Sequence, residues 1–355
     1  MKIVYDNIIY SLQKAGGISA YWSELTSRLQ NSGEDITFYG YPNDNIFMSY
    51  LDIEIKKESN INYKINRYLD FRQKFPKGTI FHSSYYRIVN QKDVVNITTV
   101  HDFTYEYYRT GLAKFIHSWQ KGRAINKSDG IVCVSHNTKK DLLKFYPNIA
   151  EDKIKVIYNG VSDIFCQLNN PTQYLKDNYH ELQNKKYILY VGDRNGYKNF
   201  DISVKVTQQI HNSTLVIIGG ATLSENEKKL LQNEYFHFQG ISAEDLNILY
   251  NNAFCLLYPS SYEGFGIPIA EAMKAGCPVV SSNASSIPEV AGYAGLLVDK
   301  IEVDEFIKIV LKLENKDFRN EIILRGIEQA KKFSWDKCFE ETLEFYKKVV
   351  GKKFS

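Results

Sequence analysis

The chain has 355 residues, a length that favours two domains over one. Hydrophobic residues make up 44% and charged residues 24% of the sequence, which is typical of a globular protein and argues against a disordered or disulfide-stapled chain. The formal net charge of +3 is too small to indicate nucleic acid as the main partner.

Short apolar runs alternate with segments of helical periodicity along the chain, which is the pattern of an α/β protein with parallel sheets. In the first half we predict strands at residues 2–5, 36–39, 79–82, 96–101, 130–134 and 154–158. After a polar stretch that begins at Gln167, strands are predicted at residues 187–191, 214–218, 235–238, 253–258, 278–281 and 296–298. Two such sets predict two Rossmann-like domains.

The same pattern suggests where the domains begin and end. We place the N-terminal domain at residues 1–165, a linker at 166–185, the C-terminal domain at 186–333 and a last helix at 334–355. A helix is also predicted after Gly16 and Gly17, with Ser19 as its N-cap. The apolar stripe of this first helix is Ile18, Tyr21, Trp22, Leu25 and Leu29, and that of the last helix is Trp335, Cys338, Phe339, Phe345, Tyr346 and Val349.

The most informative motif follows the fourth strand of the second half. It reads Ser260-Ser-Tyr-Glu263-Gly-Phe-Gly-Ile-Pro-Ile-Ala-Glu271. The glycines predict a turn, Pro268 suits the first position of a helix, and Gly276 can end that helix. Backbone N–H groups at such a helix N-terminus bind phosphate, and the flanking glutamates can accept hydrogen bonds from sugar hydroxyls. The alternative is a solvated Glu263 and a Glu271 that only complements the helix dipole.

This segment resembles the Glu-x7-Glu signature of the retaining glycosyltransferases of family four. The resemblance covers nearly the whole chain and is strongest over residues 187–300. It implies the α/β GT-B fold, in which two Rossmann-like domains face each other across a cleft and a C-terminal helix crosses back to the N-terminal domain. It also implies that Glu263 binds hydroxyls of the donor sugar and that Glu271 binds the ribose of a nucleotide diphosphate sugar. The turn that would face the donor sugar and its diphosphate is Gly264, Phe265, Gly266 and Ile267.

Arg194 and Lys198 follow the first strand of the second half. Cations four residues apart at the carboxyl end of a parallel strand can neutralise a diphosphate, the arginine as a fork and the lysine as a point charge. The pair resembles the arginine and lysine of the same family, which stabilise the leaving nucleoside diphosphate. The alternative is that both are ordinary charged residues of a surface loop.

Metal-using sugar transferases commonly carry an Asp-x-Asp pair that bridges the cation and the diphosphate. The sequence contains no such pair. We therefore expect a reaction without a metal ion, and no cofactor.

Two further motifs lie in the first half. Gly16 and Gly17 let the backbone approach a ligand closely, and in the family this loop closes over the donor from the N-terminal domain; a simple tight turn is the alternative. His101 and Asp102 resemble the family's histidine-aspartate motif. The resemblance implies that His101 contacts the donor sugar and that Asp102 orients the ring or the acceptor. A satisfied core histidine is the alternative.

Weaker signals occur at other strand ends. Asn159 lies in the turn before the expected linker, and Gly219 ends a strand that would face the same cleft. Gln239, Gly240 and Ile241 fall where the family's base pocket lies. Plain turn chemistry is the alternative for each of these positions.

We therefore expect a glycosyltransferase that moves a hexose or deoxyhexose from a nucleotide diphosphate sugar to a saccharide acceptor in the synthesis of bacterial O-antigen or capsule. The resemblance implies retention at the anomeric carbon through a front-face mechanism. The runs at residues 192–200 and 281–289 resemble mannosyl-, perosaminyl- and rhamnosyltransferases, which favours GDP-linked donors, with dTDP and UDP as alternatives. The rival hypotheses are a GT-B sugar-nucleotide epimerase and a non-catalytic sugar-nucleotide or glycan-binding module.

The sequence says less about the compartment and the partners of the protein than about its fold. The sequence has no run of about 18 apolar residues, so we expect a soluble, cytosolic protein without a membrane span. A lipid-linked acceptor would require peripheral contact with the inner membrane surface, for which the basic residues Lys121, Arg123 and Lys127 are candidates. The five cysteines contain no Cys-x-x-Cys pair and are predicted to be buried thiols.

Overall fold

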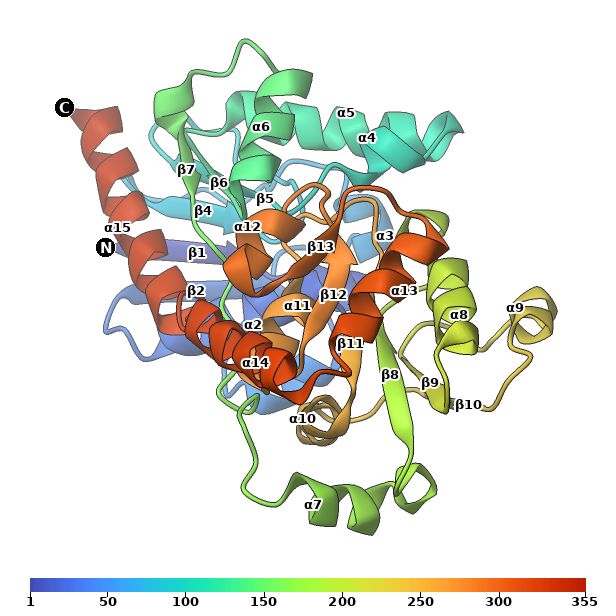
Figure 1. The fold of residues 1–355 in the computed structure, drawn as a ribbon. Helices are drawn as coiled ribbons and strands as arrows, with labels where there is room; N and C mark the ends of the chain where they lie inside the picture. The colour runs from blue at the N-terminus through green and yellow to red at the C-terminus, as the bar shows by residue number, and fades with distance from the viewer. The chain divides into compact units, whose positions relative to one another are not determined.

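The computed structural model describes residues 1–355, apart from the side chain of Tyr50. The chain forms two compact units, the first made of residues 1–160 with 335–355 and the second of residues 161–334. Each unit is built around its own parallel sheet (Figure 1). The two Rossmann-like α/β halves predicted from the alternation of strands and helices are therefore confirmed.

The first unit contains a seven-stranded sheet in the order β3-β2-β1-β4-β5-β6-β7. Its strand order reverses between β1 and β4, so the loops after these two strands diverge at the carboxyl edge of the sheet. The six predicted strands of this half are all present, and β3 is an additional edge strand. The strands are β1 (Lys2–Asp6), β2 (Asp35–Gly40), β3 (Ile55–Lys57), β4 (Ile80–Ser83), β5 (Val95–Val100), β6 (Gly130–Cys133) and β7 (Ile154–Val156).

Helices cover this first sheet, and the last helix of the chain is one of them. Helix α2 begins at Gly17, so the expectation that Ser19 is its N-cap is wrong. Ser19 lies inside the first turn, where its hydroxyl donates to the carbonyl of Gly16 at 2.9 Å. The helices are α1 (Ile9–Leu12), α2 (Gly17–Gln30), α3 (Tyr63–Asn66), α4 (Thr104–Tyr108), α5 (Gly111–Lys127), α6 (His136–Phe145) and α15 (Trp335–Phe354), with short 3-10 turns η1 (Ile46–Tyr50) and η2 (Glu151–Lys153).

Helix α15 returns to the first unit through both apolar and polar contacts. Its Trp335, Phe345, Tyr346 and Val349 belong to the same buried cluster as the stripe of α2. The Tyr346 hydroxyl lies 2.5 Å from His82 Nδ1 and 2.9 Å from the Tyr5 hydroxyl. Burial lowers the pKa of His82 to about 3, so this ring is neutral at ordinary pH. The expected C-terminal helix that crosses back to the N-terminal domain is thus present.

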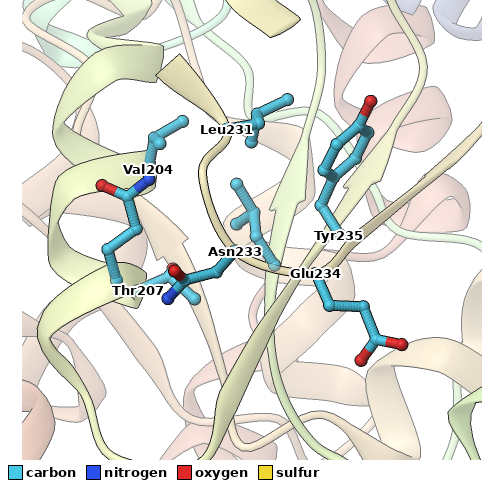
Figure 2. A pocket seen from close by; sticks show the side chains of 8 residues that line it. Val204, Thr207, Leu231, Asn233, Glu234 and Tyr235 are labelled. Carbon is cyan, nitrogen blue, oxygen red and sulfur yellow. The ribbon is translucent and has the colours of Figure 1, made fainter. Parts of the chain in front are cut away.

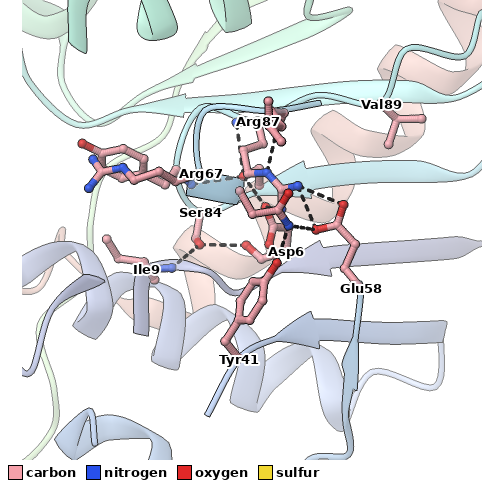
Figure 3. A network of polar contacts seen from close by, with 12 residues as sticks. Asp6, Ile9, Tyr41, Glu58, Arg67, Ser84, Arg87 and Val89 are labelled. Carbon is pink, nitrogen blue, oxygen red and sulfur yellow. Dashed lines mark hydrogen bonds and ion pairs between the residues drawn. The ribbon is translucent and has the colours of Figure 1, made fainter. Parts of the chain in front are cut away.

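A buried ionic network lies at the carboxyl end of β1 (Figure 3). Arg87 donates to both oxygens of Glu58 at 2.8 and 2.9 Å and to Asp6 Oδ2 at 3.1 Å. Asn66 adds a 2.7 Å bond to Glu58, and Ser83 adds a 2.9 Å bond to Asp6. Removing one charge from such a network would leave its partners buried and unpaired, so the network fixes the loops around β1 and β4.

The second unit contains a six-stranded sheet in the order β10-β9-β8-β11-β12-β13, with its reversal between β8 and β11. All six strands predicted for this half are present. They are β8 (Lys186–Val191), β9 (Ser213–Ile218), β10 (Tyr235–Phe238), β11 (Cys255–Tyr258), β12 (Val279–Ser282) and β13 (Leu296–Val298). The helices are α7 (Pro171–Asn178), α8 (Phe200–Gln209), α9 (Glu225–Leu230), α10 (Ala243–Asn252), α11 (Ile267–Lys274), α12 (Ile287–Ala291), α13 (Val303–Lys312) and α14 (Lys316–Ala330), with 3-10 turns η3 (His180–Leu182), η4 (Gly196–Lys198) and η5 (Gly292–Ala294).

The segment 166–185, predicted to be a linker, belongs to the second unit and contains helix α7. The side chain of Asn247 accepts from the N–H of Cys166 at 3.1 Å, and that of Asn251 accepts from the N–H of Leu168 at 2.8 Å. These bonds hold the segment against helix α10.

The cysteines and the helices bear on two further expectations. Cys133, Cys255, Cys277 and Cys338 are buried as free thiols, but Cys166 is exposed, so the expectation of five buried cysteines is wrong at that position. Cys166 is exposed because it lies in the segment that packs only along the border of α10.

Within the described part of the chain, no helix combines the length and the apolar character needed to span a membrane.

Candidate active site

The strand order of the second unit places four of the predicted residues at one edge of its sheet. The loop after β8 carries Arg194 and Lys198, and the loop after β11 leads through Glu263 into α11, which carries Glu271. Because β8 and β11 are neighbours at the point where the strand order reverses, both loops lie at the carboxyl edge, where open α/β sheets bind ligands.

Lys198 and Glu263 form an ion pair that joins the two loops. Lys198 Nζ lies 2.5 Å from Glu263 Oε1 and 2.9 Å from the hydroxyl of Tyr258, at the end of β11. The two charged side chains are only 13% and 12% exposed, so neither is an ordinary surface residue. Burial alone would lower the pKa of Lys198, but the Glu263 carboxylate together with Tyr258 and Tyr197 outweighs it and holds this pKa well above its ordinary value. Lys198 is therefore a fixed cation.

The turn between Glu263 and α11 is held in place by two serines at the start of α12. The Ser285 hydroxyl accepts from the N–H of Glu263 at 2.8 Å, and the Ser286 hydroxyl donates to the carbonyls of Glu263 and Phe265 at 2.9 and 3.0 Å. Gly266, with φ of 98°, adopts the left-handed conformation that starts the helix at Ile267. Pro268, the second residue of the helix, has no N–H, and the N–H of Ile269 donates to the carbonyl of Gly266 at 3.0 Å, so anion binding by this turn, which includes Gly264, stays a prediction.

Glu271 lies one helical turn further along α11 and is half-buried. The Tyr250 hydroxyl lies 3.3 Å from its Oε2 and 3.4 Å from the carbonyl of Pro268. Burial raises the pKa of Glu271 to about 7, and the hydrogen bond from Tyr250 only partly offsets this. Glu271 is thus a carboxyl group whose charge changes near neutral pH.

Arg194 is held by helix α9 and by the loop after β9. Its Nε lies 2.6 Å from Glu227 Oε1, its Nη1 donates to the carbonyl of Gly219 at 3.2 Å, and its Nη2 donates to the carbonyl of Ala221. Glu227 is itself fixed, because its other oxygen accepts from the N–H and the hydroxyl of Ser224 at the start of α9. The arginine side chain is 5% exposed, so Arg194 is not an ordinary surface residue either.

The loops after β9 and β10 complete this edge of the sheet. Gly219 adopts φ of 82° and Gly240 φ of 64°, conformations that favour glycine. The Gln239 side chain donates to the carbonyl of Gly220 at 2.7 Å, which ties the two loops together, and Ile241 follows in the same loop. These positions stay predictions as contacts of the nucleotide base.

The first unit holds a second group of the predicted residues. Gly16 precedes α2 and Gly17 is its first residue, after the loop that follows β1. A Cβ at Gly16 would lie 2.9 Å from Gln13 Oε1, but this is the end of a flexible side chain that can move aside, so the contact by itself does not require glycine. Asn159 lies beyond β7, is 4% exposed, and its Oδ1 has no hydrogen-bond partner within the described residues.

His101 and Asp102 follow β5 and differ in charge. Burial lowers the pKa of His101 to about 4, and its Nε2 has no hydrogen-bond partner among the residues that the structure describes. The role of His101 in the site stays a prediction. Burial alone would raise the pKa of Asp102, but the Lys121 ammonium and the N–H of Thr104, at 2.8 Å, outweigh it and lower the pKa. A neutral imidazole thus sits beside an ionised carboxylate.

Other features of the structure add little to this picture. Within the described part of the chain, no group of three or more His, Cys, Asp or Glu side chains could hold a metal ion, and metal independence stays a prediction.

A small pocket beside α8 lies near the amino-terminal ends of β9 and β10, away from the carboxyl edge (Figure 2). The pocket is lined by Val204, Thr207, Gln208, Leu215, Leu231, Asn233, Glu234 and Tyr235, none of which is a predicted site residue.

The residues that position the predicted site residues were not predicted from the sequence. Lys198 is held by Tyr258, and Glu271 is held by Tyr250. The turn is held by Ser285 and Ser286, and Arg194 is held by Glu227. The capping-box spacing of Ser224 and Glu227 is a signal that the sequence offered for α9. That spacing predicts a helix start but does not reveal that Glu227 reaches back to Arg194.

Comparison with known proteins identifies the family of the chain. Residues 173–333 match the family described as "Glycosyl transferases group 1", and residues 15–163 match "Glycosyltransferase Family 4". The "O-antigen chain mannosyltransferase B" of Escherichia coli is 30% identical over 268 residues, which cover 71% of this chain and 70% of that protein. The chain belongs to the group 1 glycosyltransferases.

Two further similarities place this glycosyltransferase among its relatives. The "O-antigen chain mannosyltransferase RfbU" of Salmonella typhimurium is 30% identical over 209 residues, covering 57% of this chain and 56% of that protein. The structure of HepE from Anabaena in complex with UDP-glucose superposes with a TM-score of 0.74 at 15% identity, covering 97% and 98% of the two chains. The GT-B fold expected for this glycosyltransferase is therefore confirmed.

Proposed function

We propose that this glycosyltransferase transfers a mannosyl or closely related hexosyl or deoxyhexosyl group from a GDP-linked donor, with retention and without a metal ion. The acceptor would be a saccharide of a bacterial surface polysaccharide, such as an O-antigen. The names of the two mannosyltransferases that are 30% identical support this choice of sugar and acceptor. One observation carries the proposed donor site. The Lys198 ammonium donates to both Glu263 and Tyr258 at the point where the strand order reverses.

The residues of the second unit receive the following roles in this proposal. Lys198 and Arg194 stabilise the charge that develops on the departing diphosphate, because preorganised cations in a partly buried site cost little reorganisation during the reaction. Glu263 accepts hydrogen bonds from hydroxyls of the donor sugar, and Glu271 accepts them from the ribose. The turn from Gly264 to Ile267 faces the donor sugar and its diphosphate in this proposal.

The reaction we propose is a front-face substitution at the anomeric carbon. The bond between that carbon and the phosphate oxygen breaks, and its electron pair stays on the nucleoside diphosphate. The acceptor hydroxyl forms the new bond on the same face and gives its proton to a departing phosphate oxygen. In the first unit, the neutral His101 is suited to hydrogen-bond the donor sugar through its unpartnered Nε2, and the ionised Asp102 to orient the acceptor.

The first test is a thermal-shift panel of GDP, UDP, dTDP, ADP and CMP without metal, on the wild type and on Arg194→Ala. A nucleotide that binds the native state raises the melting temperature by mass action. We expect GDP to raise it most, and the shift to shrink in Arg194→Ala because the diphosphate loses a cation. Arg325→Ala is the matched control, since Arg325 lies exposed on α14 and pairs only with Glu321 among the described residues.

The results discriminate among the proposals. A largest shift with UDP or dTDP would overturn the GDP assignment, and a shift that requires magnesium would overturn the metal-free route. An equal shift in Arg194→Ala would overturn the assignment of Arg194 to the diphosphate. Release of GDP from GDP-mannose that depends on a saccharide acceptor separates a transferase from an epimerase and from a non-catalytic module.

A further inference from the structure

Arg67 is a half-buried arginine whose guanidinium has no acceptor in the described chain. It follows α3, and its Nε is buried without a hydrogen-bond partner. The other arginines that are buried or half-buried all have acceptors. Carboxylates pair with Arg28, Arg87, Arg123 and Arg194, and two carbonyls accept from Arg319. Withdrawing a charged donor from water without an acceptor costs free energy, so this exception indicates that a ligand supplies the acceptor.

Two tyrosine rings hold the Arg67 guanidinium. Its central carbon lies 4.3 Å from the centre of the Tyr85 ring and 5.1 Å from the centre of the Tyr68 ring. A guanidinium held over aromatic rings presents the N–H groups of its edge, which match two oxygens of a phosphate or a carboxylate. In Figure 3 the Arg67 side chain lies apart from Asp6 and Glu58, the acids of the buried ionic network. The fold therefore fixes Arg67 as a cation without neutralising it.

A buried glutamine of α5 joins the two segments that carry Arg67 and Tyr85. The Gln120 amide donates to the carbonyl of Arg67 and, at 3.4 Å, to the carbonyl of Tyr85, and this residue is 2% exposed. His117, also on α5, stacks on Tyr105 of α4 with the ring centres 3.8 Å apart, and its ring centre lies 6.1 Å from that of Tyr85. Side chains from several segments thus converge, and we call the following residues the Arg67 cluster: Arg67, Tyr68, Tyr85, Tyr105 and His117.

The Arg67 cluster lies near Asp102 at the carboxyl edge of the first sheet. Tyr85 follows β4, and Asp102 follows the neighbouring strand β5. Burial raises the pKa of Tyr85 to about 12, while the charge of Arg67 lowers it and the charge of Asp102 raises it, so both charges act on this ring. Lys121 of α5 is fully buried and pairs with Glu106 at 2.8 Å, so the expectation that Lys121 offers a surface charge is wrong. Unlike Lys121, Arg67 stays available to a ligand.

We propose that the Arg67 cluster binds an oxyanion, a phosphate or a carboxylate, that the saccharide acceptor carries. The Arg67 guanidinium donates hydrogen bonds to two oxygens of this group, and the tyrosine rings contact the sugar that bears it. The inference rests on the proposed function, in which Asp102 orients the acceptor. A carboxylate repels an oxyanion, so the two residues bind different ends of the acceptor, Asp102 a hydroxyl and Arg67 the charged group.

The test measures the affinity of the full chain for mannose, mannose 6-phosphate and glucuronic acid by ligand-observed NMR. Saturating GDP is present, so that the proposed diphosphate site is filled. We expect at least one of the two anionic sugars to bind at least about tenfold tighter than mannose, the gain from hydrogen bonds between charged groups, and the one that does identifies the oxyanion. Arg67→Gln should remove this gain. Arg72→Gln is the matched control, because Arg72 is an exposed arginine of the same segment.

Labelling of arginines with phenylglyoxal gives a second, local readout on the wild type, so it does not require a variant to fold. The reagent reacts with accessible guanidinium groups, and peptide mapping reports on each arginine separately. We expect the anionic sugar that binds to protect Arg67 from the reagent, and mannose at the same concentration to protect it much less. Labelling of the exposed Arg72 should not change with either sugar.

Three outcomes would overturn the proposal. The first is equal affinity of the wild type for all three sugars. The second is a gain in affinity that Arg67→Gln and Arg72→Gln reduce equally. The third is labelling of Arg67 that neither anionic sugar slows. The thermal shift with GDP, measured on Arg67→Gln, shows whether the variant folds and keeps its donor site, so failure of this inference is distinguishable from failure of the proposed function.

Discussion

Two tyrosine hydroxyls, those of Tyr258 and Tyr250, each lie against a charged residue of the proposed donor site. Tyr258 contacts Lys198 rather than any proposed ligand, so it is a positioning residue. Its hydroxyl and Glu263 are two acceptors for the three N–H groups of the ammonium, which leaves one N–H for a phosphate oxygen. The direction of that remaining N–H therefore depends on both acceptors.

Tyr258→Phe should lower kcat about tenfold, the cost of one lost hydrogen bond to a charged group, with KM for the donor changed much less. The measurement is steady-state kinetics with GDP-mannose. Tyr187→Phe is the control, because the Tyr187 hydroxyl is also buried and donates to the carbonyl of Leu249 at 2.6 Å, but contacts no proposed site residue. Equal losses of kcat in both variants would mean that Tyr258 acts only through stability.

Glu271 leads to a prediction about pH. Burial raises its pKa to about 7, so near pH 6 the group is mostly neutral and near pH 8 mostly ionised. The ionised form is the better acceptor for two ribose hydroxyls, so donor affinity should fall by about tenfold for each pH unit below about 7. Isothermal titration with GDP-mannose measures this, since its diphosphate diester does not itself titrate in that range.

The effect of the same group on stability runs in the opposite direction. Because the folded-state pKa is raised, the contribution of Glu271 to the free energy of unfolding is fully present below the ordinary carboxyl pKa. It declines as pH rises towards about 7 and is constant above. Glu271→Gln should remove the pH dependence of donor affinity, and persistence of that dependence in the variant would assign it to another group.

At the same scale, the sequence predicts candidate residues for the chemistry, whose roles stay predictions, but it does not reveal which residues hold them in place. Glu263 and Glu271 are recognisable by their spacing, and Lys198 by its place after a strand. The pairing of Lys198 with Glu263 joins positions 65 residues apart, and the Tyr258 contact spans 60. Local periodicity contains no information on contacts of that range, so only the fold reveals them.

At the scale of elements, prediction succeeded where burial gives a clear pattern. Most predicted strands are short, largely buried apolar runs, which periodicity detects well, and the half-buried edge strands β7, β10 and β13 are predicted too because they keep apolar residues. β3 was missed because its three residues, Ile55 to Lys57, are half-buried or exposed at the sheet edge. α7 was missed for a related reason, since Leu175 is its one buried residue among those described and its polar composition resembles that of a linker.

At the scale of the whole molecule, the chain leaves the first unit after Gly160 and re-enters it at Trp335. The apolar stripe of α15 predicted a helix, and the resemblance implied where it would pack. The contact that allows this packing is local to Gly160, because a Cβ at this position would lie 2.2 Å from the backbone nitrogen and 2.5 Å from the Cα of Trp335. A glycine in an otherwise unremarkable Asn-Gly turn therefore sets how closely α15 approaches.

Gly160→Ala should consequently destabilise the first unit by about 1 to 3 kcal/mol, the usual cost of forcing extra atoms into a packed site, because the backbone at the start of α15 must move. Gly351→Ala is the matched control: Gly351 lies within α15 and a Cβ there meets nothing within 4 Å, so this change should be neutral or stabilise the helix by up to about 1 kcal/mol. Chemical unfolding followed by tryptophan fluorescence reports on the right place, since Trp22 and Trp335 both belong to the core of the first unit. If Gly160→Ala unfolds at the same denaturant concentration as the wild type, the start of α15 can shift without cost and the close approach at Gly160 does not fix the helix.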